Sequence, residues 1–136
     1  MKTFSLSTTK RECLVDVTRE VAAAVAKSGV KEGLCTVFVL HTTAAATINE
    51  NADPDVARDV VAFLSEHIPR HWRFRHVEGN SDAHVKASLV GPSVQIPVTG
   101  GRLALGTWQA VYFAEFDGPR TRQCHVTVLG TAEGDE

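Results

Sequence analysis

The segment 34–40, Leu-Cys-Thr-Val-Phe-Val-Leu, is the feature that most constrains how this chain can fold. It is almost continuously apolar and rich in β-branched and aromatic residues, which is typical of a strand with both faces buried. A strand of this kind is stable only where other parts of the chain cover both of its faces. We therefore expect residues 34–40 to form a strand that is buried on both faces.

The remaining segments supply both strands and helices. Alternating apolar and polar residues predict a strand over 3–8, which 13–17 could prolong. Valines at helical spacing predict a helix from 16 or 18 to 28, and Asp53 followed by Pro54 is typical of the start of a second helix. Further predicted elements are a strand over 44–48, a helix over 82–89 capped by Ser81, and strands over 93–98, 103–105, 109–115 and 122–129. This order predicts one antiparallel α+β domain over residues 1–136, with helices packed against its sheets.

Composition excludes several classes of function. The chain has 136 residues and a formal net charge of −2, so it offers no broad basic surface for nucleic acid. No apolar run is long enough to span a bilayer, and the N-terminus lacks the apolar segment of a secretory signal, so we expect a cytoplasmic protein without a membrane partner. The scattered cysteines Cys13, Cys35 and Cys124 favour small buried residues over disulfides or a thiolate zinc site.

Residues 76–88, His-Val-Glu-Gly-Asn-Ser-Asp-Ala-His-Val-Lys-Ala-Ser, concentrate ionisable side chains. A turn at Gly79-Asn80 before a helix can bring His76 near His84, beside free backbone N–H groups that suit an anion or a metal. A plain alternative is a polar loop and a capped surface helix, with Asp82 and Lys86 as an ordinary ion pair.

Polar residues also stand at the ends of predicted strands. His41-Thr42-Thr43 follows the central strand, and Asn49 and Glu50 follow the strand over 44–48. In the strand over 109–115, Gln109 and Glu115 occupy opposite ends of an otherwise apolar face, where polar groups need partners or a ligand.

Four motifs, in this order, resemble one family: His41-Thr42-Thr43, Ile48 to Asp55, Glu78 to Lys86, and Leu105-Gly106-Thr107-Trp108-Gln109. It is the YjbQ-like family, whose members are often described as secondary thiamine-phosphate synthase enzymes. The resemblance implies a compact α+β subunit with a mostly antiparallel, β-sandwich-like core, two to three helices, trimeric assembly and a polar pocket near a subunit boundary. The family's polar positions fall on His41, Thr42, Asn49, Glu50, Asp53, His76, Glu78, His84, Lys86, Trp108 and Gln109.

The implied activity joins a hydroxymethylpyrimidine diphosphate to a thiazole phosphate. Such a reaction needs donors for phosphate, for which Lys86 and the N–H groups at Ser81 to Ala83 are candidates, and an aromatic wall such as Trp108. Magnesium would require carboxylates, for example Glu50, Asp53 or Asp82.

Two other functions fit the same residues. His41, His76 and His84 suit zinc or another divalent metal, in a metal-dependent hydrolase or lyase with Glu78 or Glu50 as general base. The chain is also compatible with a non-catalytic trimer that binds a small phosphorylated ligand, with Trp108 as an interface anchor. The candidate catalytic residues are His84, Glu50, Glu78 and Lys86; the candidate ligand-binding residues are Thr42, Thr43, Asn49, Asn80, Ser81, Asp82, Trp108, Gln109 and Glu115.

Overall fold

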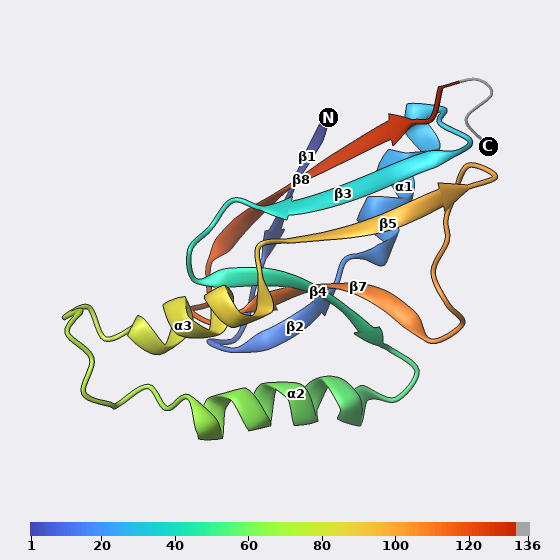
Figure 1. The fold of residues 1–136 in the computed structure, drawn as a ribbon. Coiled ribbons are helices and arrows are strands. Elements are labelled where there is room, and N and C mark those ends of the chain that lie inside the picture. The colour runs from blue at the N-terminus through green and yellow to red at the C-terminus, as the bar shows by residue number, and fades with distance from the viewer. Residues whose placement is uncertain (133–136) are drawn as a thin grey trace.

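A computed structural model of the protein describes residues 1–132 (Figure 1). Three helices and eight strands follow one another along this part of the chain: β1 (Lys2–Ser7), β2 (Cys13–Asp16), α1 (Thr18–Ser28), β3 (Gly33–Val39), β4 (Ala44–Glu50), α2 (Pro54–His67), α3 (Ser81–Val90), β5 (Ser93–Thr99), β6 (Arg102–Leu103), β7 (Gln109–Glu115) and β8 (Thr121–Gly130). All the strand pairs are antiparallel, so the predicted α+β class is confirmed.

The strands form two sheets. Sheet A has the order β1-β8-β3-β5-β6, and sheet B has the order β2-β7-β4. Helices α2 and α3 lie along the side of sheet B that faces away from sheet A (Figure 1), while α1 contacts β6 and β8 of sheet A and β7 of sheet B. Sheet B is therefore the middle layer, and both of its faces are covered.

The larger core fills the space between the two sheets. Val37 of β3, Val126 of β8 and Phe113 of β7 are buried there together with Val21 of α1. A smaller core on the other face of sheet B is built mainly from alanines of β4, β7 and α3 around Phe116. Small residues at these positions let α3 approach the sheet closely, which fixes the helix that carries His84.

The prediction that residues 34–40 are buried on both faces is wrong for the single chain. Cys35, Val37 and Val39 point into the core, but Leu34 and Phe38 on the opposite face are each 43% exposed. β3 is the central strand of sheet A, and no helix or sheet among residues 1–132 lies over the outer face of that sheet.

The outer face of sheet A carries no charged side chain on its four long strands. Strand alternation and the pairing register place these residues there: Thr3, Ser5, Ser7, Leu34, Thr36, Phe38, Ser93, Gln95, Pro97, Thr99, Thr121, Gln123, His125, Thr127 and Leu129. We refer to these fifteen residues as the outer face of sheet A.

Several local expectations need correction. Residues 13–16 do not prolong β1 but pair with β7 in the other sheet, because the intervening loop crosses between the layers. Strand β4 continues through Glu50, so Asn49 and Glu50 lie within the strand. Helix α3 begins at Ser81 with Asn80 at the cap position. Helix α2 begins as expected, with the Asp53 side chain accepting a hydrogen bond from the Asp55 N–H at 2.9 Å.

Within residues 1–132, no helix is long and apolar enough to cross a membrane.

Candidate functional site

A polar cavity of about 350 Å³ lies where the ends of β3, β7 and β8 meet the start of α3. It is lined by Leu40, His41, Thr42, Thr43, Glu78, Asn80, His84, Asp117, Arg120 and Arg122. We call it the His84 pocket. Six of the residues predicted from sequence are thereby brought together from two distant segments, 41–43 and 78–84.

The pairing of β4 with β7 explains this convergence. Ala44 lies opposite Glu115, so the turn before β4 and the turn after β7 leave the same end of sheet B. The second turn, residues 116–120, contains a cis peptide bond between Gly118 and Pro119 and brings Asp117 and Arg120 to the pocket.

His41 is held in one tautomer. Its Nε2 accepts a hydrogen bond from the backbone N–H of Gln123 at 2.8 Å, so the ring proton resides on Nδ1. Burial lowers the pKa of His41, and the neighbouring positive charge of Arg122 lowers it further. His41 is therefore a neutral hydrogen-bond donor through Nδ1 at neutral pH.

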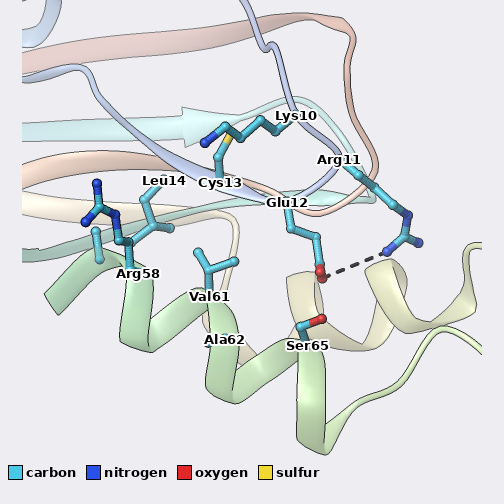
Figure 2. A pocket seen from close by; sticks show the side chains of 10 residues that line it. Lys10, Arg11, Glu12, Cys13, Leu14, Arg58, Val61, Ala62 and Ser65 are labelled. Carbon is cyan, nitrogen blue, oxygen red and sulfur yellow. Dashed lines mark ion pairs between the residues drawn. The ribbon is translucent and has the colours of Figure 1, made fainter. Parts of the chain in front are cut away.

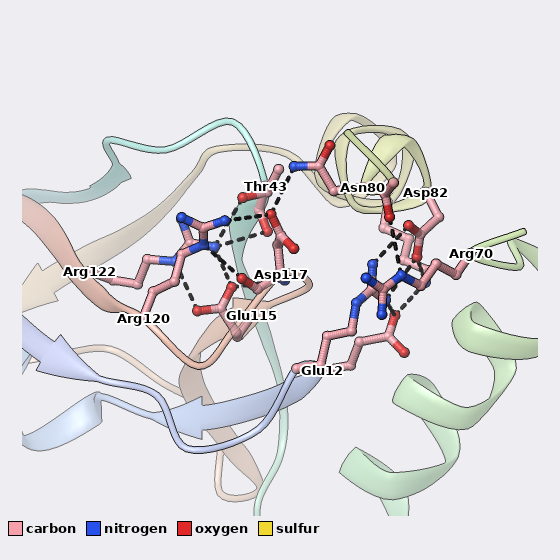
Figure 3. A network of polar contacts seen from close by, with 12 residues as sticks. Glu12, Thr43, Arg70, Asn80, Asp82, Glu115, Asp117, Arg120 and Arg122 are labelled. Carbon is pink, nitrogen blue, oxygen red and sulfur yellow. Dashed lines mark hydrogen bonds and ion pairs between the residues drawn. The ribbon is translucent and has the colours of Figure 1, made fainter. Parts of the chain in front are cut away.

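A buried ion pair joins Arg122, which lines the pocket, to Glu115 (Figure 3). Arg122 Nε donates to Glu115 Oε1 at 2.8 Å, and Arg122 Nη2 donates to Glu115 Oε2 and to Thr43 Oγ1. Thr8 Oγ1 also donates to Glu115, at 2.7 Å. Burial alone would raise the pKa of Glu115, but the hydrogen bonds from Arg122 and Thr8 outweigh it and hold that pKa below its usual value. Glu115, predicted as a ligand-binding residue, is thus already saturated by protein donors.

Asn80 offers an unused acceptor. Its Nδ2 donates to Asp117 Oδ2 at 2.9 Å, and Arg120 binds the same carboxylate oxygen at 3.0 Å. Asn80 Oδ1 is buried and has no donor among the described residues. Because a buried acceptor without a partner is unfavourable, this atom is suited to a donor group of a ligand.

The two central histidines do meet, as the sequence predicts. The rings of His76 and His84 are edge to face with centroids 5.4 Å apart, and His76 Nε2 lies 3.6 Å from Glu78 Oε2. His76 nevertheless lines the adjoining cavities, with Ser81, and not the His84 pocket itself.

The predicted three-histidine metal set does not assemble in one chain. His41 already uses the Nε2 lone pair, and a metal ligand needs a free lone pair. Among the residues that the structure describes, no three His, Cys, Asp or Glu side chains are grouped so that they could hold a metal ion. The geometry of the single chain therefore does not fit zinc on these residues, and the metal stays a prediction.

Lys86 and Asp82 lie behind the pocket and not in it. Lys86 is 1% exposed, and its Nζ donates to Asp82 Oδ2 at 2.7 Å and to Glu12. Arg11 donates to both carboxylate oxygens of Asp82, at 3.1 and 2.9 Å. This network joins the loop after β1 to α3 and holds the helix in place. Asp82 and Lys86 therefore form a buried ion pair, and the alternative of an ordinary ion pair on a surface helix is wrong.

Another group of predicted residues lies at the opposite end of sheet B. Glu50 pairs with Gln109. Glu50 lies six residues along β4 from Ala44, and at the usual rise of a strand these two residues are about 20 Å apart. Asn49 and Trp108 lie at this same end, and Trp108 is 62% exposed. Within one chain, these residues do not reach His84.

Asp117, Arg120 and Arg122 line the pocket, although no sequence motif indicates them as site residues. The available signal was the run Glu115 to Arg122, in which two arginines follow a Gly-Pro turn between two strands. A turn of this kind is a usual place for functional side chains, but nothing local indicates that it faces His84.

Comparison with known proteins identifies the family. The family described as "UPF0047 protein YjbQ-like" matches residues 2–131. A UPF0047 protein of Methanocaldococcus jannaschii is 53% identical over 127 residues, covering 93% of this chain and 92% of the relative. YugU of Bacillus subtilis is 50% identical over 131 residues, covering 96% and 99%. The chain therefore belongs to the YjbQ-like family.

Solved structures of relatives share the fold. A YjbQ/UPF0047 family protein from Clostridium acetobutylicum superposes with a TM-score of 0.94 at 50% identity, covering 95% of this chain and 100% of the relative. A conserved hypothetical protein from Thermus thermophilus gives a TM-score of 0.88 at 44% identity, with the same coverage. The predicted YjbQ-like fold is thus confirmed over nearly the whole chain.

Proposed function

We propose that this member of the YjbQ-like family binds a small phosphorylated substrate in the His84 pocket and acts as a thiamine-phosphate synthase-like transferase. The observation that supports this most directly is the convergence of His41, His84 and Arg120 on one cavity of about 350 Å³. Three nitrogen donors around a small cavity are the arrangement that phosphate oxygens require.

The pocket combines a donor side with an acceptor side. His41 Nδ1–H and the Arg120 guanidinium supply donors, while Asn80 Oδ1 and Glu78 supply acceptors. A simple anion such as chloride would use only the donors. A phosphate ester that also carries an amino or hydroxyl group would use both sides, which is true of an aminopyrimidine diphosphate.

The proposed reaction forms a bond between the thiazole nitrogen and the methylene carbon of the pyrimidine. The carbon–oxygen bond to pyrophosphate breaks, and pyrophosphate leaves with the electron pair. Arg120 and His41 would stabilise the negative charge that develops on the leaving group, and His84 would donate to it or protonate it.

A metal-dependent hydrolase or lyase is the alternative function, and bound zinc would favour it. Its support within the chain is the contact between His76 and His84, with Glu78 beside them as a possible general base. Elemental analysis of the purified protein tests it, since one zinc per chain, lost in His84→Ala and in His76→Ala, would favour this function over the transferase.

Assembly as a homotrimer is also part of the proposal, and the outer face of sheet A supports it. Protein interfaces are depleted of charged residues at their centre, and the fifteen residues of this face include no Lys, Arg, Asp or Glu but do include the exposed Leu34, Phe38 and Leu129. Leu40 is both exposed and part of the His84 pocket, so a neighbouring subunit on this face would lie beside the pocket. The same surface would serve a non-catalytic, ligand-binding trimer.

Turnover distinguishes these functions. Purified protein would be incubated with hydroxymethylpyrimidine diphosphate and thiazole phosphate, and thiamine phosphate and pyrophosphate would be quantified. We expect His84→Ala and Arg120→Gln each to reduce product formation by about 100-fold, whereas His67→Ala, a histidine of α2 outside the pocket, should not change it. Equal rates in all variants would exclude the pocket as the active site. Binding of pyrophosphate without turnover would favour the non-catalytic, ligand-binding trimer over the transferase.

A further inference from the structure

The loop that joins α2 to α3 forms a cavity of about 390 Å³. Apart from Ser81 at the start of α3, every residue that lines it belongs to this loop. The lining includes Arg70, His71, Trp72, Phe74 and His76. We call it the Trp72 cavity. Its volume is within the range of sites for small organic molecules, and it shares no lining residue with the His84 pocket.

Contacts within the loop give this cavity a defined shape. Arg70 Nε donates to the backbone oxygen of Gly79 at 3.1 Å, which joins the two ends of the loop. The Phe74 N–H donates to the backbone oxygen of Trp72 at 2.8 Å, and the rings of these two residues lie 5.2 Å apart. Compact loops whose ends meet are frequently functional. Arg70 and Gly79 both line the cavity, so their contact is part of its wall.

The charge of this loop is one-sided. Arg70, Arg73 and Arg75 lie close together in the sequence, and no aspartate or glutamate occurs between Glu66 and Glu78. None of the three arginines forms an ion pair within residues 1–132. No carboxylate lines the Trp72 cavity. The loop is therefore a local concentration of positive charge on a chain of net charge −2, and such a concentration attracts anions.

A larger cavity, of about 500 Å³, lies between α2 and the segment that leads into β2 and has a different charge pattern (Figure 2). Its two arginines already have acidic partners, since Arg11 donates to Asp82 and Arg58 donates to Asp55. Glu12, 3.9 Å from Arg11, adds a carboxylate to the lining. The arginine of the Trp72 cavity, by contrast, has no carboxylate partner in the described chain.

The rest of the Trp72 cavity is mainly aromatic. Trp72 is 58% exposed, and Phe74 lies against it. Arg73 Cζ lies 5.0 Å from the centre of the Trp72 ring, so a guanidinium is already stacked there. Aromatic side chains bind flat rings by offset or edge-to-face stacking, while guanidinium groups bind phosphate oxygens. A ligand that combines a phosphate with a ring therefore matches both parts of the lining.

The position of the Trp72 cavity relates it to the proposed reaction. His76 and Ser81 line both this cavity and a neighbouring one of about 300 Å³, which also contains His84. His84 in turn lines the pocket that we assign to the pyrimidine diphosphate. A thiamine-phosphate synthase-like transferase brings together two phosphorylated substrates. Because their like charges repel, each substrate needs its own positively charged donors.

We propose that the Trp72 cavity is a subsite for the second substrate of the transfer, a phosphate monoester that carries a flat ring. Arg70 provides the positive charge for the phosphate, and the Trp72–Phe74 pair provides the surface for the ring. This inference rests on the function proposed for the His84 pocket. Binding at the two places is nevertheless measurable separately, because they share no residue.

Trp72 is a natural reporter for this subsite. The chain has two tryptophans, and the other one, Trp108, lies at the opposite end of sheet B, so Trp108→Phe makes Trp72 the only source of tryptophan fluorescence. Phenyl phosphate is the probe, and quenching of this fluorescence is the measurement. Because phenyl phosphate has few heavy atoms, we expect half-maximal quenching at roughly millimolar concentration. Inorganic phosphate and phenol should each bind at least about 10-fold more weakly, since each lacks one of the two features.

Substitutions in the Trp108→Phe background separate this subsite from nonspecific binding. Arg70→Gln removes the charge but keeps a donor for Gly79, and should weaken binding of phenyl phosphate about 10-fold. His71→Asp places a carboxylate in the lining and should abolish binding. Arg102→Gln, an exposed arginine of β6, is the matched control and should leave binding unchanged. Thermal unfolding verifies that each variant is folded. Absence of saturable quenching, or equal affinity in Arg70→Gln and His71→Asp, would overturn the proposal.

Kinetics in the Trp108-containing protein connect the subsite to the reaction. Arg70→Gln should raise the KM for thiazole phosphate about 10-fold and leave the KM for the pyrimidine diphosphate unchanged. Arg120→Gln, in the His84 pocket, should weaken binding of pyrophosphate but not of phenyl phosphate. Equal increases of both KM values in Arg70→Gln would contradict a subsite for one substrate. Binding of phenyl phosphate with the expected variant effects, but no binding of pyrophosphate, would support an aromatic phosphate site here and contradict the function proposed for the His84 pocket.

Discussion

Glu115 at the end of β7 and Arg122 near the start of β8 form an enclosed ion pair between the two sheets. Arg122 Nε donates to Glu115 Oε1 at 2.8 Å, and Arg122 Nη2 contacts Glu115 Oε2, while Thr8 and the Asp117 N–H donate to the same carboxylate. The pair connects sheet B with sheet A directly beneath the His84 pocket. Its integrity therefore determines both the stability of the layers and the position of the pocket residues.

Replacing Glu115 with Gln should destabilise the protein strongly. The substitution removes the negative charge but leaves the Arg122 guanidinium buried, which costs about 3 kcal/mol in comparable buried pairs. Chemical denaturation measures this loss. The double variant Glu115→Gln, Arg122→Met should be less destabilised than the sum of the two single variants. Glu66→Gln, an exposed control on α2, should change the free energy of unfolding by less than about 0.5 kcal/mol.

Asp82 should make the stability of the protein sensitive to acid. Burial alone would raise the pKa of Asp82, but hydrogen bonds from Arg11 and Lys86 outweigh it and hold the folded-state pKa below the usual value. The unfolded chain therefore takes up the proton first, so this stabilisation is fully present above about pH 5 and is lost as pH falls through the folded-state pKa. Unfolding measured from pH 7 to pH 3 should show a shallower decline in Asp82→Asn. An identical slope would contradict this role.

His41 should titrate below an ordinary histidine. Burial and then the charge of Arg122 lower the pKa of His41, so the folded protein resists its protonation. The stability that this contributes is present above about pH 6.5 and is lost as pH falls toward the folded-state pKa. Two-dimensional ¹H–¹⁵N spectra of the imidazole should show a proton on Nδ1 and an acceptor at Nε2 at pH 7. A proton on Nε2 would disprove both the tautomer and the donor role.

Introducing a charge on the outer face of sheet A should prevent assembly. Phe38 is exposed at the centre of this face, so Phe38→Glu would place a carboxylate in the proposed subunit interface, where desolvation is unfavourable. Light scattering should give three times the 14.7 kDa subunit mass for the parent and one subunit for the variant. Phe63→Glu, which places the same charge on an exposed aromatic residue of α2, is the matched control and should leave the assembly unchanged. A monomeric parent protein would remove the trimer altogether.

Much of the secondary structure could be predicted because its causes are local. The valine spacing of residues 17–25 and the Asp53-Pro54 cap each determine a helix within a few residues, and both helices are present. Part of the site was predictable for the same reason, since a turn at Gly79-Asn80 is sufficient to fold His76 back toward His84. Motif resemblance identified the family and fold.

Burial and side-chain partners could not be predicted in this way. The apolar run 34–40 gives no indication that one of its faces is left open, because that depends on how many layers the rest of the chain supplies. Sequence also could not place Lys86 in a buried network or Arg120 beside His84, because each contact joins segments more than thirty residues apart.

The sequence alone therefore determined the helices, most strands, the family and the approach of His76 to His84, since these follow from periodicity, capping and motifs of neighbouring residues. Only the tertiary structure decided which polar residues share a cavity. The β4–β7 register places His41 and Arg120 beside His84 and places Glu50 and Gln109 at the opposite end of sheet B. Register is a property of strand pairs, and no single segment encodes it.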